Sequence, residues 1–275
     1  MEVFQLNTRW KKKIKNKIDM LSLHFKNLSL LFICIFFSAK IFAQNNALLL
    51  KEAQNLELKF DEAGALEKYK QLAANDASNI NILVKCAEFN CSIGERQKDK
   101  KVKTGYFQQA QNFAQQAYTK DPVNANACYA MALVAAKMTE VADDNKEIID
   151  YVKQIKTYAD KALAIDPNHA KANYVLGKWH FELIRLSWIK KAAIKVFYGG
   201  ISDTQIDSAA YYMEKARSIE PYFVLDYLEL AKVYDYDHQR AKAIAVLEKL
   251  VKLPNRTFDD AALKEEGKQM LGSMQ

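Results

Sequence analysis

Runs of small and hydrophobic residues, separated by short polar turns, follow one another along most of the chain. Three of the turns hold an acidic residue followed by proline, at Pro122, Pro167 and Pro221, and each of these prolines has alanine five residues before it. A new helical pattern opens about three residues after each proline. Because proline ends one helix and turns the chain, the pattern predicts successive helices joined by tight turns.

Small residues recur at corresponding places between these turns, where they let two helix backbones approach closely. They are Ala65, Ala87, Ala110, Ala117, Ala132, Ala162, Gly177, Ala209, Ala216, Ala231 and Ala243. This layout resembles the tetratricopeptide repeat (TPR), a helix pair of about 34 residues. Such pairs bury their apolar faces against their neighbours and form a curved binding surface. Glycine (8) and proline (4) are scarce in the 275 residues, which favours helix throughout.

The resemblance implies an all-α fold, a right-handed TPR-like α-solenoid of about five helix pairs with helical inserts and a C-terminal capping helix. The four prolines are 45, 54 and 33 residues apart, so the first two intervals exceed a plain repeat. We expect the extra residues inside the helix pairs, at 94–103, 139–149 and 184–202. A last helix at about 259–272 is expected to begin with Thr257 and Asp260 as a capping pair.

Charge divides the chain at about residue 43. Residues 1–43 carry eight basic and two acidic residues, so little of the net charge of +7 belongs to the rest. The basic balance therefore does not indicate nucleic-acid binding by the repeat region.

The first 43 residues have the order of a secretory signal. A basic head precedes a short apolar run at 28–39, and Ala43 stands before the polar Gln44. We expect residues 1–43 to be a signal peptide cleaved near Ala43, and residues 44–275 to be the helical repeat domain of a periplasmic or secreted protein. A membrane anchor formed by residues 28–43 is the alternative, and Met20 is an alternative start.

Catalytic motifs are absent from the sequence: it holds no HExxH, GxSxG, GxxxxGK[ST] or GxGxxG. Three cysteines follow the leader, Cys86, Cys91 and Cys128, an odd number without the spacing of a metal site. We expect them to be buried at helix contacts. The sequence predicts no enzyme activity, no metal and no cofactor.

The TPR register places a partner-binding surface on the first helix of each pair. Positions 2, 5, 9 and 12 of these helices line the concave face of a TPR superhelix. Leu133, Leu225 and Leu228 fall at these positions, together with the tyrosines and lysines named below. A mixture of tyrosine, lysine and leucine suits an extended peptide or an amphipathic ligand. An ordinary solvated face is the alternative. The expected partner-binding residues are Asn126, Tyr129, Lys171, Tyr174, Lys178, Phe181 and Lys232.

The third insert is apolar on one side. Leu186, Ile189, Ala193, Val196 and Phe197 fall on one helical face, and Ser202 with Gln205 is expected to cap the next helix. The insert predicts an extra helix packed on the solenoid, a docking helix for a partner, or a contact with a membrane surface. The residues expected to matter in it are Trp188, Ile189, Lys190, Lys191 and Phe197.

The same region resembles the regulator-of-microtubule-dynamics family of TPR proteins. The resemblance lies in "LGKWHFEL", "LSWIKKAAIKVF", "AAYYMEKARSIEP", "LELAKVY" and "AIAVLEKLVKLP" and covers roughly residues 85–272. It implies association with microtubules or the spindle in animal members, and phospholipid handling in one organelle-contact member. The leader of this chain is secretory and bacterial in style, and an exported bacterial protein would meet no microtubules.

These observations predict a non-enzymatic interaction scaffold of the bacterial envelope that binds a partner protein, as a peptide or helix, in its concave groove. A carrier of lipid or another hydrophobic ligand is a second hypothesis, suggested by the family and the apolar insert. A regulator of the cytoskeleton is a third, and it requires that the leader is not a signal. A membrane contact is expected only through an uncleaved leader or the helix at 186–197.

Overall fold

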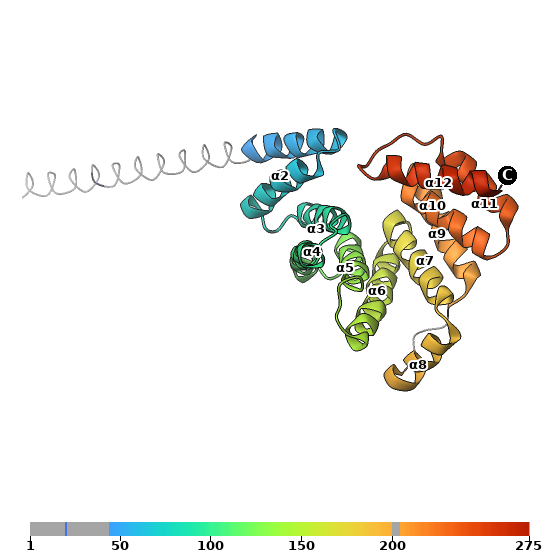
Figure 1. Cartoon of the computed structure of the whole chain (residues 1–275). Coiled ribbons are helices and arrows are strands. Elements are labelled where there is room, and N and C mark those ends of the chain that lie inside the picture. The colour runs from blue at the N-terminus through green and yellow to red at the C-terminus, as the bar shows by residue number, and fades with distance from the viewer. Residues whose placement is uncertain (1–19, 21–43, 200–203, 275) are drawn as a thin grey trace, which may run out of the picture. The chain divides into compact units, whose positions relative to one another are not determined.

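The computed structural model describes residue 20, residues 44–199 and residues 204–274. The chain divides into two compact units, Met1–Leu49 and Leu50–Gln275, and the second contains the repeat core. Regular structure in the described residues is α-helix (Figure 1). The predicted signal peptide at 1–43 lies outside these residues apart from Met20, so its cleavage stays a prediction.

The helices of the second unit pack as consecutive antiparallel pairs, as the sequence predicts. Helical residues 50–58 meet α2 (Glu62–Asn75) through a Lys68–Glu52 ion pair of 2.7 Å. Four further pairs follow in the described residues (Figure 1). They are α3 (Ile80–Glu95) with α4 (Lys100–Lys120), α5 (Ala125–Met138) with α6 (Asn145–Ile165), α7 (Ala170–Arg185) with α9 (Ile206–Ile219), and α10 (Val224–Tyr236) with α11 (Arg240–Leu250).

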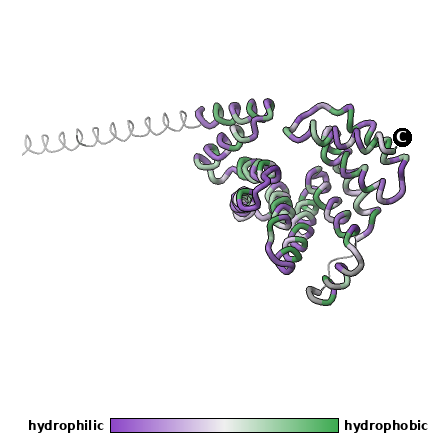
Figure 2. Tube along the Cα trace, viewed as in Figure 1, coloured by the Kyte–Doolittle hydropathy of each residue, from purple (hydrophilic) through white to green (hydrophobic). Residues whose placement is uncertain are grey.

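The small residues of the repeat lie where the helices touch. All ten of the alanines named above are fully buried. A Cβ atom on Gly177 of α7 would stand 2.8 Å from Cγ of Met213 and 3.0 Å from the carbonyl oxygen of Ala209, both on α9. Hydrophobic and hydrophilic positions alternate along each helix of the second unit (Figure 2). The all-α solenoid fold predicted from the spacing is confirmed.

The turns between pairs repeat one set of hydrogen bonds. Oδ1 of Asp121 accepts from the N–H of Val123 at 3.1 Å, and the Asn124 side chain caps α5 by accepting from the N–H of Ala127 at 3.2 Å. Asp166 and His169 make the same two contacts before α7. The polar residues around Pro122 and Pro167 therefore satisfy the helix ends, whereas at Pro221 the N-cap of α10 is Phe223, which makes no side-chain cap bond.

The inserts lengthen some pairs and interrupt one. Helices α4 and α6 have 21 residues each, against 16 in α3 and 14 in α5, so the first two inserts mainly extend the second helices. The third forms α8 (Trp188–Tyr198) between α7 and α9. The capping box expected before α9 is wrong. Gln205 was expected three residues after the N-cap, but it is itself the N-cap and makes no side-chain cap bond. Ser202 lies outside the described residues.

The last helix, α12 (Asp260–Met274), packs on α10 and α11 and caps the stack. The carboxylate of Asp260 accepts from the N–H of Thr257 at 2.9 Å and from its hydroxyl at 2.6 Å. It also accepts from the N–H of Arg256 at 2.6 Å. The expected capping pair is present, with Asp260 buried at 3% exposure and Thr257 exposed.

Candidate functional site

The first helices of three consecutive pairs, α3, α5 and α7, lie side by side and line an open hollow of about 370 Å³. Eight of its ten lining residues are polar or charged and the other two are Val84 and Ala170, but most of the surface that lines it is apolar. Its polar lining includes Asn81 and Glu88 of α3 and Asn126 and Tyr129 of α5. It also includes His169, the N-cap residue of α7, and Lys171 within α7.

A ladder of hydrogen bonds joins the three helices at their N-terminal ends. Nδ2 of Asn126 donates to Oδ1 of Asn81 at 3.2 Å, and Nε2 of His169 lies 3.0 Å from Oδ1 of Asn126. Nδ1 of His169 accepts from the N–H of Ala172 at 3.1 Å, so in the neutral ring Nε2 carries the proton and donates to Asn126. Burial lowers the pKa of His169, which favours that neutral form.

Glu88 is the charged centre of the hollow. Its carboxylate lies 2.7 Å from Nζ of Lys171, and it also accepts a hydrogen bond from Tyr129. Burial acts to raise the pKa of Glu88, but Lys171, Lys85 and the hydrogen bonds outweigh it, and the pKa is lowered. Burial and the nearby Glu88 raise the pKa of Tyr129 well above its usual value. The hollow therefore holds a carboxylate, an ammonium group and a neutral phenol.

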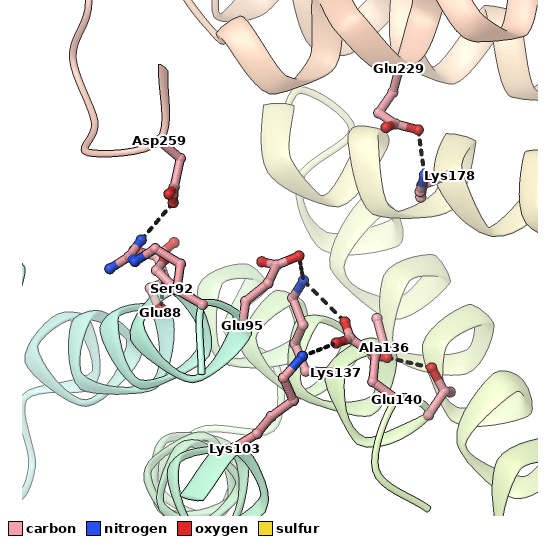
Figure 3. A network of polar contacts seen from close by, with 12 residues as sticks. Glu88, Ser92, Glu95, Lys103, Ala136, Lys137, Glu140, Lys178, Glu229 and Asp259 are labelled. Carbon is pink, nitrogen blue, oxygen red and sulfur yellow. Dashed lines mark hydrogen bonds and ion pairs between the residues drawn. The ribbon is translucent and has the colours of Figure 1, made fainter. Parts of the chain in front are cut away.

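The other lysines expected to bind a partner are already paired with carboxylates of this chain. Lys178 of α7 bonds to Glu229 of α10, a pair drawn in Figure 3, and Glu229 is 5% exposed. Lys232 lies 3.1 Å from Glu229 and 2.8 Å from Glu266. These lysines connect neighbouring helices, so a partner would meet ion pairs on this face rather than free ammonium groups.

One aromatic residue of the predicted site lies elsewhere than expected. Phe181 is 2% exposed and packs in the core with α9 and α10, so the prediction that it lines the groove needs correction. Its position on α7 faces the next helix pair. Tyr174 is partly buried, with its ring edge-on to Phe223 at 5.0 Å between centroids. Leu228, also expected on the groove, is fully buried.

The structure brings Asn126, Tyr129 and Lys171 of the predicted set together in one hollow. Sequence reasoning missed Glu88, although it occupies position 9 of the second repeat when Ile80 is position 1 and the same register would have found it. Glu229 falls at position 6 of its helix, outside positions 2, 5, 9 and 12.

In the insert, Lys190 and Lys191 are exposed, while the side chains of Trp188, Ile189 and Phe197 lie outside the described part.

A second polar network lies on α3 and α5. Nζ of Lys137 is 2.7 Å from Glu95 and 3.5 Å from Glu140, and Lys103 of α4 reaches Glu140 at 3.3 Å (Figure 3). The pKa of Lys137 is raised, because the two carboxylates outweigh the opposing effect of burial. These contacts hold neighbouring helices in register.

Arg96, just after α3, contacts a segment far away in the sequence. It lies 2.7 Å from Asp259, bonds to Glu62 of α2, and has its guanidinium 4.4 Å from the ring centre of Phe258. We call these contacts the Arg96 clasp. It joins the second repeat to the segment before α12.

Other chemistry has little support in the described residues. Cys86, Cys91 and Cys128 are free and buried, as expected, and burial raises the pKa of Cys86 and Cys91 to about 12. Within residues 44–199 and 204–274, three or more metal-binding side chains do not gather at any point. The described helices are too short or too polar to cross a membrane.

The chain is similar in sequence to one family and in fold to several solved structures. A family model described as "Regulator of microtubule dynamics protein 1-3" matches residues 49–275. No curated protein matches the chain. A thermophilic TPR protein of Thermus thermophilus, TTC0263, is 13% identical with a TM-score of 0.60, covering 82% of this chain and 99% of that one.

Two further solved structures share the fold. PilW, a type IV pilus biogenesis factor, is 16% identical with a TM-score of 0.51, over 84% of this chain and 93% of PilW. PilF of Pseudomonas aeruginosa is 10% identical with a TM-score of 0.50, over 85% of this chain and 90% of PilF. At these identities the likeness shows a TPR-like fold.

Proposed function

The chain belongs to the regulator of microtubule dynamics protein 1-3 family, and we propose that it is a non-enzymatic TPR-like interaction module. It binds an extended segment of a partner protein in the hollow between α3, α5 and α7. Helical repeats commonly present such a surface on their inner helices. The charged and amide groups of this hollow favour a peptide over a lipid chain, because a lipid chain could not pair with them.

The observation that carries the proposal is the ladder of Asn81, Asn126 and His169. Asn81 and Asn126 stand at the same position of successive helices, and both are exposed. An amide side chain offers one acceptor oxygen and two donor hydrogens, so it can pair with the main chain of a peptide irrespective of its sequence. Lys171 and Glu88 lie beside the ladder and are placed to select charged side chains of the partner.

We further propose that the protein works in the bacterial envelope, supported by the signal-like residues 1–43. In that compartment the microtubule role named by the family would not apply. N-terminal sequencing of the protein from an envelope fraction is expected to begin at Gln44. Recovery of the intact chain from the cytosol would contradict export.

The binding proposal is tested with a displayed library of random 12-residue peptides. A selected peptide is labelled and its affinity for the chain from Gln44 is measured by fluorescence anisotropy. Replacing both ladder amides, Asn81→Ala with Asn126→Ala, is expected to weaken binding at least tenfold, since each lost hydrogen bond contributes about 1 kcal/mol. Asn112→Ala, an exposed asparagine on the outer helix α4, serves as the matched control and is expected to bind normally. Equal affinity of all three proteins would overturn the proposal.

A further inference from the structure

The helix α8 stands apart from the repeat pattern. It is inserted between the two helices of the fourth pair and projects from the stack, with contacts to α6 and, through Lys191, to α7 (Figure 1). Its ends are fixed by their own caps: the Ser187 hydroxyl accepts from the N–H of Lys190 at 3.4 Å, and Gly199 ends the helix at a φ of 73°. Backbone groups at both ends of the helix therefore have hydrogen-bond partners within the segment itself.

The charge of this segment is entirely positive. Residues 183–202 hold Arg185, Lys190, Lys191 and Lys195 and no acidic residue, in a repeat domain whose other charges nearly balance. All three lysines of α8 are exposed. Lys191 also donates to the carbonyl oxygen of Ile184 at 3.0 Å, which holds its ammonium group at the start of the helix.

The apolar side of α8 faces solvent where the structure describes it. Val196 is 75% exposed and Ala192, one turn earlier, is exposed as well, whereas Ile194 on the lysine side is partly buried. By helical spacing alone, the sequence places Trp188, Ile189, Ala193 and Phe197 on the same arc as Val196. Exposed apolar residues such as Ala192 and Val196, bordered by lysines, are typical of a helix that lies on a lipid surface.

We propose that α8 docks the protein onto an anionic lipid surface. Val196 and its neighbours on the arc enter the boundary between headgroups and acyl chains, while Lys190, Lys191 and Lys195 meet the phosphates. The absence of acidic residues from 183–202 favours a uniformly anionic surface over a protein surface of mixed charge. This docking is independent of the peptide hollow, which lies on other helices.

The test uses the chain from Gln44, which includes the compact unit Leu50–Gln275 and lacks the apolar leader. Its co-sedimentation is measured with vesicles of phosphatidylcholine alone and of phosphatidylcholine with phosphatidylglycerol at a ratio of about 7:3. We expect binding to the anionic vesicles only. Reversing Lys190, Lys191 and Lys195 to Glu is expected to reduce partitioning roughly hundredfold, from the attraction of each basic residue to an anionic surface. Val196→Asp is expected to reduce it at least tenfold.

The matched control reverses three other exposed lysines, Lys249, Lys252 and Lys268, and so changes the net charge equally. It is expected to retain most of the binding, and circular dichroism checks that all variants are folded. Failure of the unaltered chain to bind anionic vesicles would overturn the proposal, and so would an equal loss in the control. If the unaltered chain proves to be a dimer, and Val196→Asp dissociates that dimer but still binds vesicles, the apolar arc is an interface between copies of the chain. That result would also overturn the proposal.

Discussion

Single residues explain why the helices of this protein pack so closely and how its inner face is charged. Alanine and glycine at the contact positions are visible in the sequence, and their burial could be predicted from spacing alone. The partners of Lys171 and Lys178 could not, because the carboxylates of Glu88 and Glu229 come from other helices, up to 83 residues away. An ion pair between helices depends on the packed arrangement, which the local pattern does not encode.

Gly177 gives a stability test with an internal control. Gly177→Ala is expected to lower the free energy of unfolding by about 1–3 kcal/mol, because the new Cβ meets Met213 and the backbone of Ala209. Gly105→Ala on α4 has nothing within 4 Å of its Cβ and is expected to be neutral or stabilising, since alanine favours helix. Urea unfolding measures both, and equal stabilities for the two variants would contradict the close packing of α7 on α9.

The charge of Glu88 makes stability depend on pH. Its pKa is lowered in the folded protein from a usual value of 4.5, so its contribution is complete above that value and is lost as pH falls through the folded pKa. Glu88→Gln is expected to cost about 1–2 kcal/mol at neutral pH, allowing for the partial exposure of Lys171. The difference from the unaltered protein is expected to shrink below pH 4.5. Glu248→Gln, at an exposed site on α11, is the control, and a pH-independent difference for Glu88→Gln would contradict the account.

At the scale of elements, the helix ends were the most predictable feature and the inserts the least. Asn124 and Asp260 could be read as capping residues because capping depends on neighbours a few residues away. The register before α9 was misjudged, since Gln205 holds the N-cap position without a side-chain bond. The orientation of α8 could not be predicted either: its apolar arc suggested packing against the solenoid, while Val196 points to solvent.

The buried cap of α12 is expected to control the order of the last helix. Asp260→Ala removes three hydrogen bonds and is expected to lower stability by about 1–2 kcal/mol. Amide hydrogen exchange in 260–274 is expected to rise accordingly. Asp207→Ala in the first turn of α9, where the carboxylate is exposed, is expected to change stability by less than about 0.5 kcal/mol. An unchanged exchange rate in α12 would show that its packing on α10 and α11 holds it without the cap.

Within the second unit, the Arg96 clasp and the Glu88–Lys171 pair both depart from the rule that repeats touch only their neighbours. The Arg96 clasp joins residues 163 positions apart, connecting the end of α3 to the segment before α12. Nothing in the local sequence around Arg96 indicates this partner, because it depends on how several repeats stack. The contact restrains the segment that leads into the C-terminal cap.

Removing the clasp is expected to loosen that segment without unfolding the stack. Arg96→Ala is expected to raise the rate of amide hydrogen exchange in residues 255–259 at least threefold. This corresponds to a fall of about 0.7 kcal/mol or more in the free energy of local opening. High salt is expected to act in the same direction on the unaltered chain. Lys100→Ala breaks a pair with Asp143 whose side chains are 61% and 89% exposed, and is expected to have no such effect. Equal exchange in all variants would mean that the segment is held by other contacts.

The most direct test of the peptide-binding hollow is a crystal structure of the chain from Gln44 with a peptide selected from the random library. The main chain of the peptide is expected within hydrogen-bond distance of the side-chain amides of Asn81 and Asn126, about 3 Å. A charged side chain of the peptide is expected beside Glu88 and Lys171. A peptide bound on the outer helices α4 and α6, with the ladder unoccupied, would contradict the proposal.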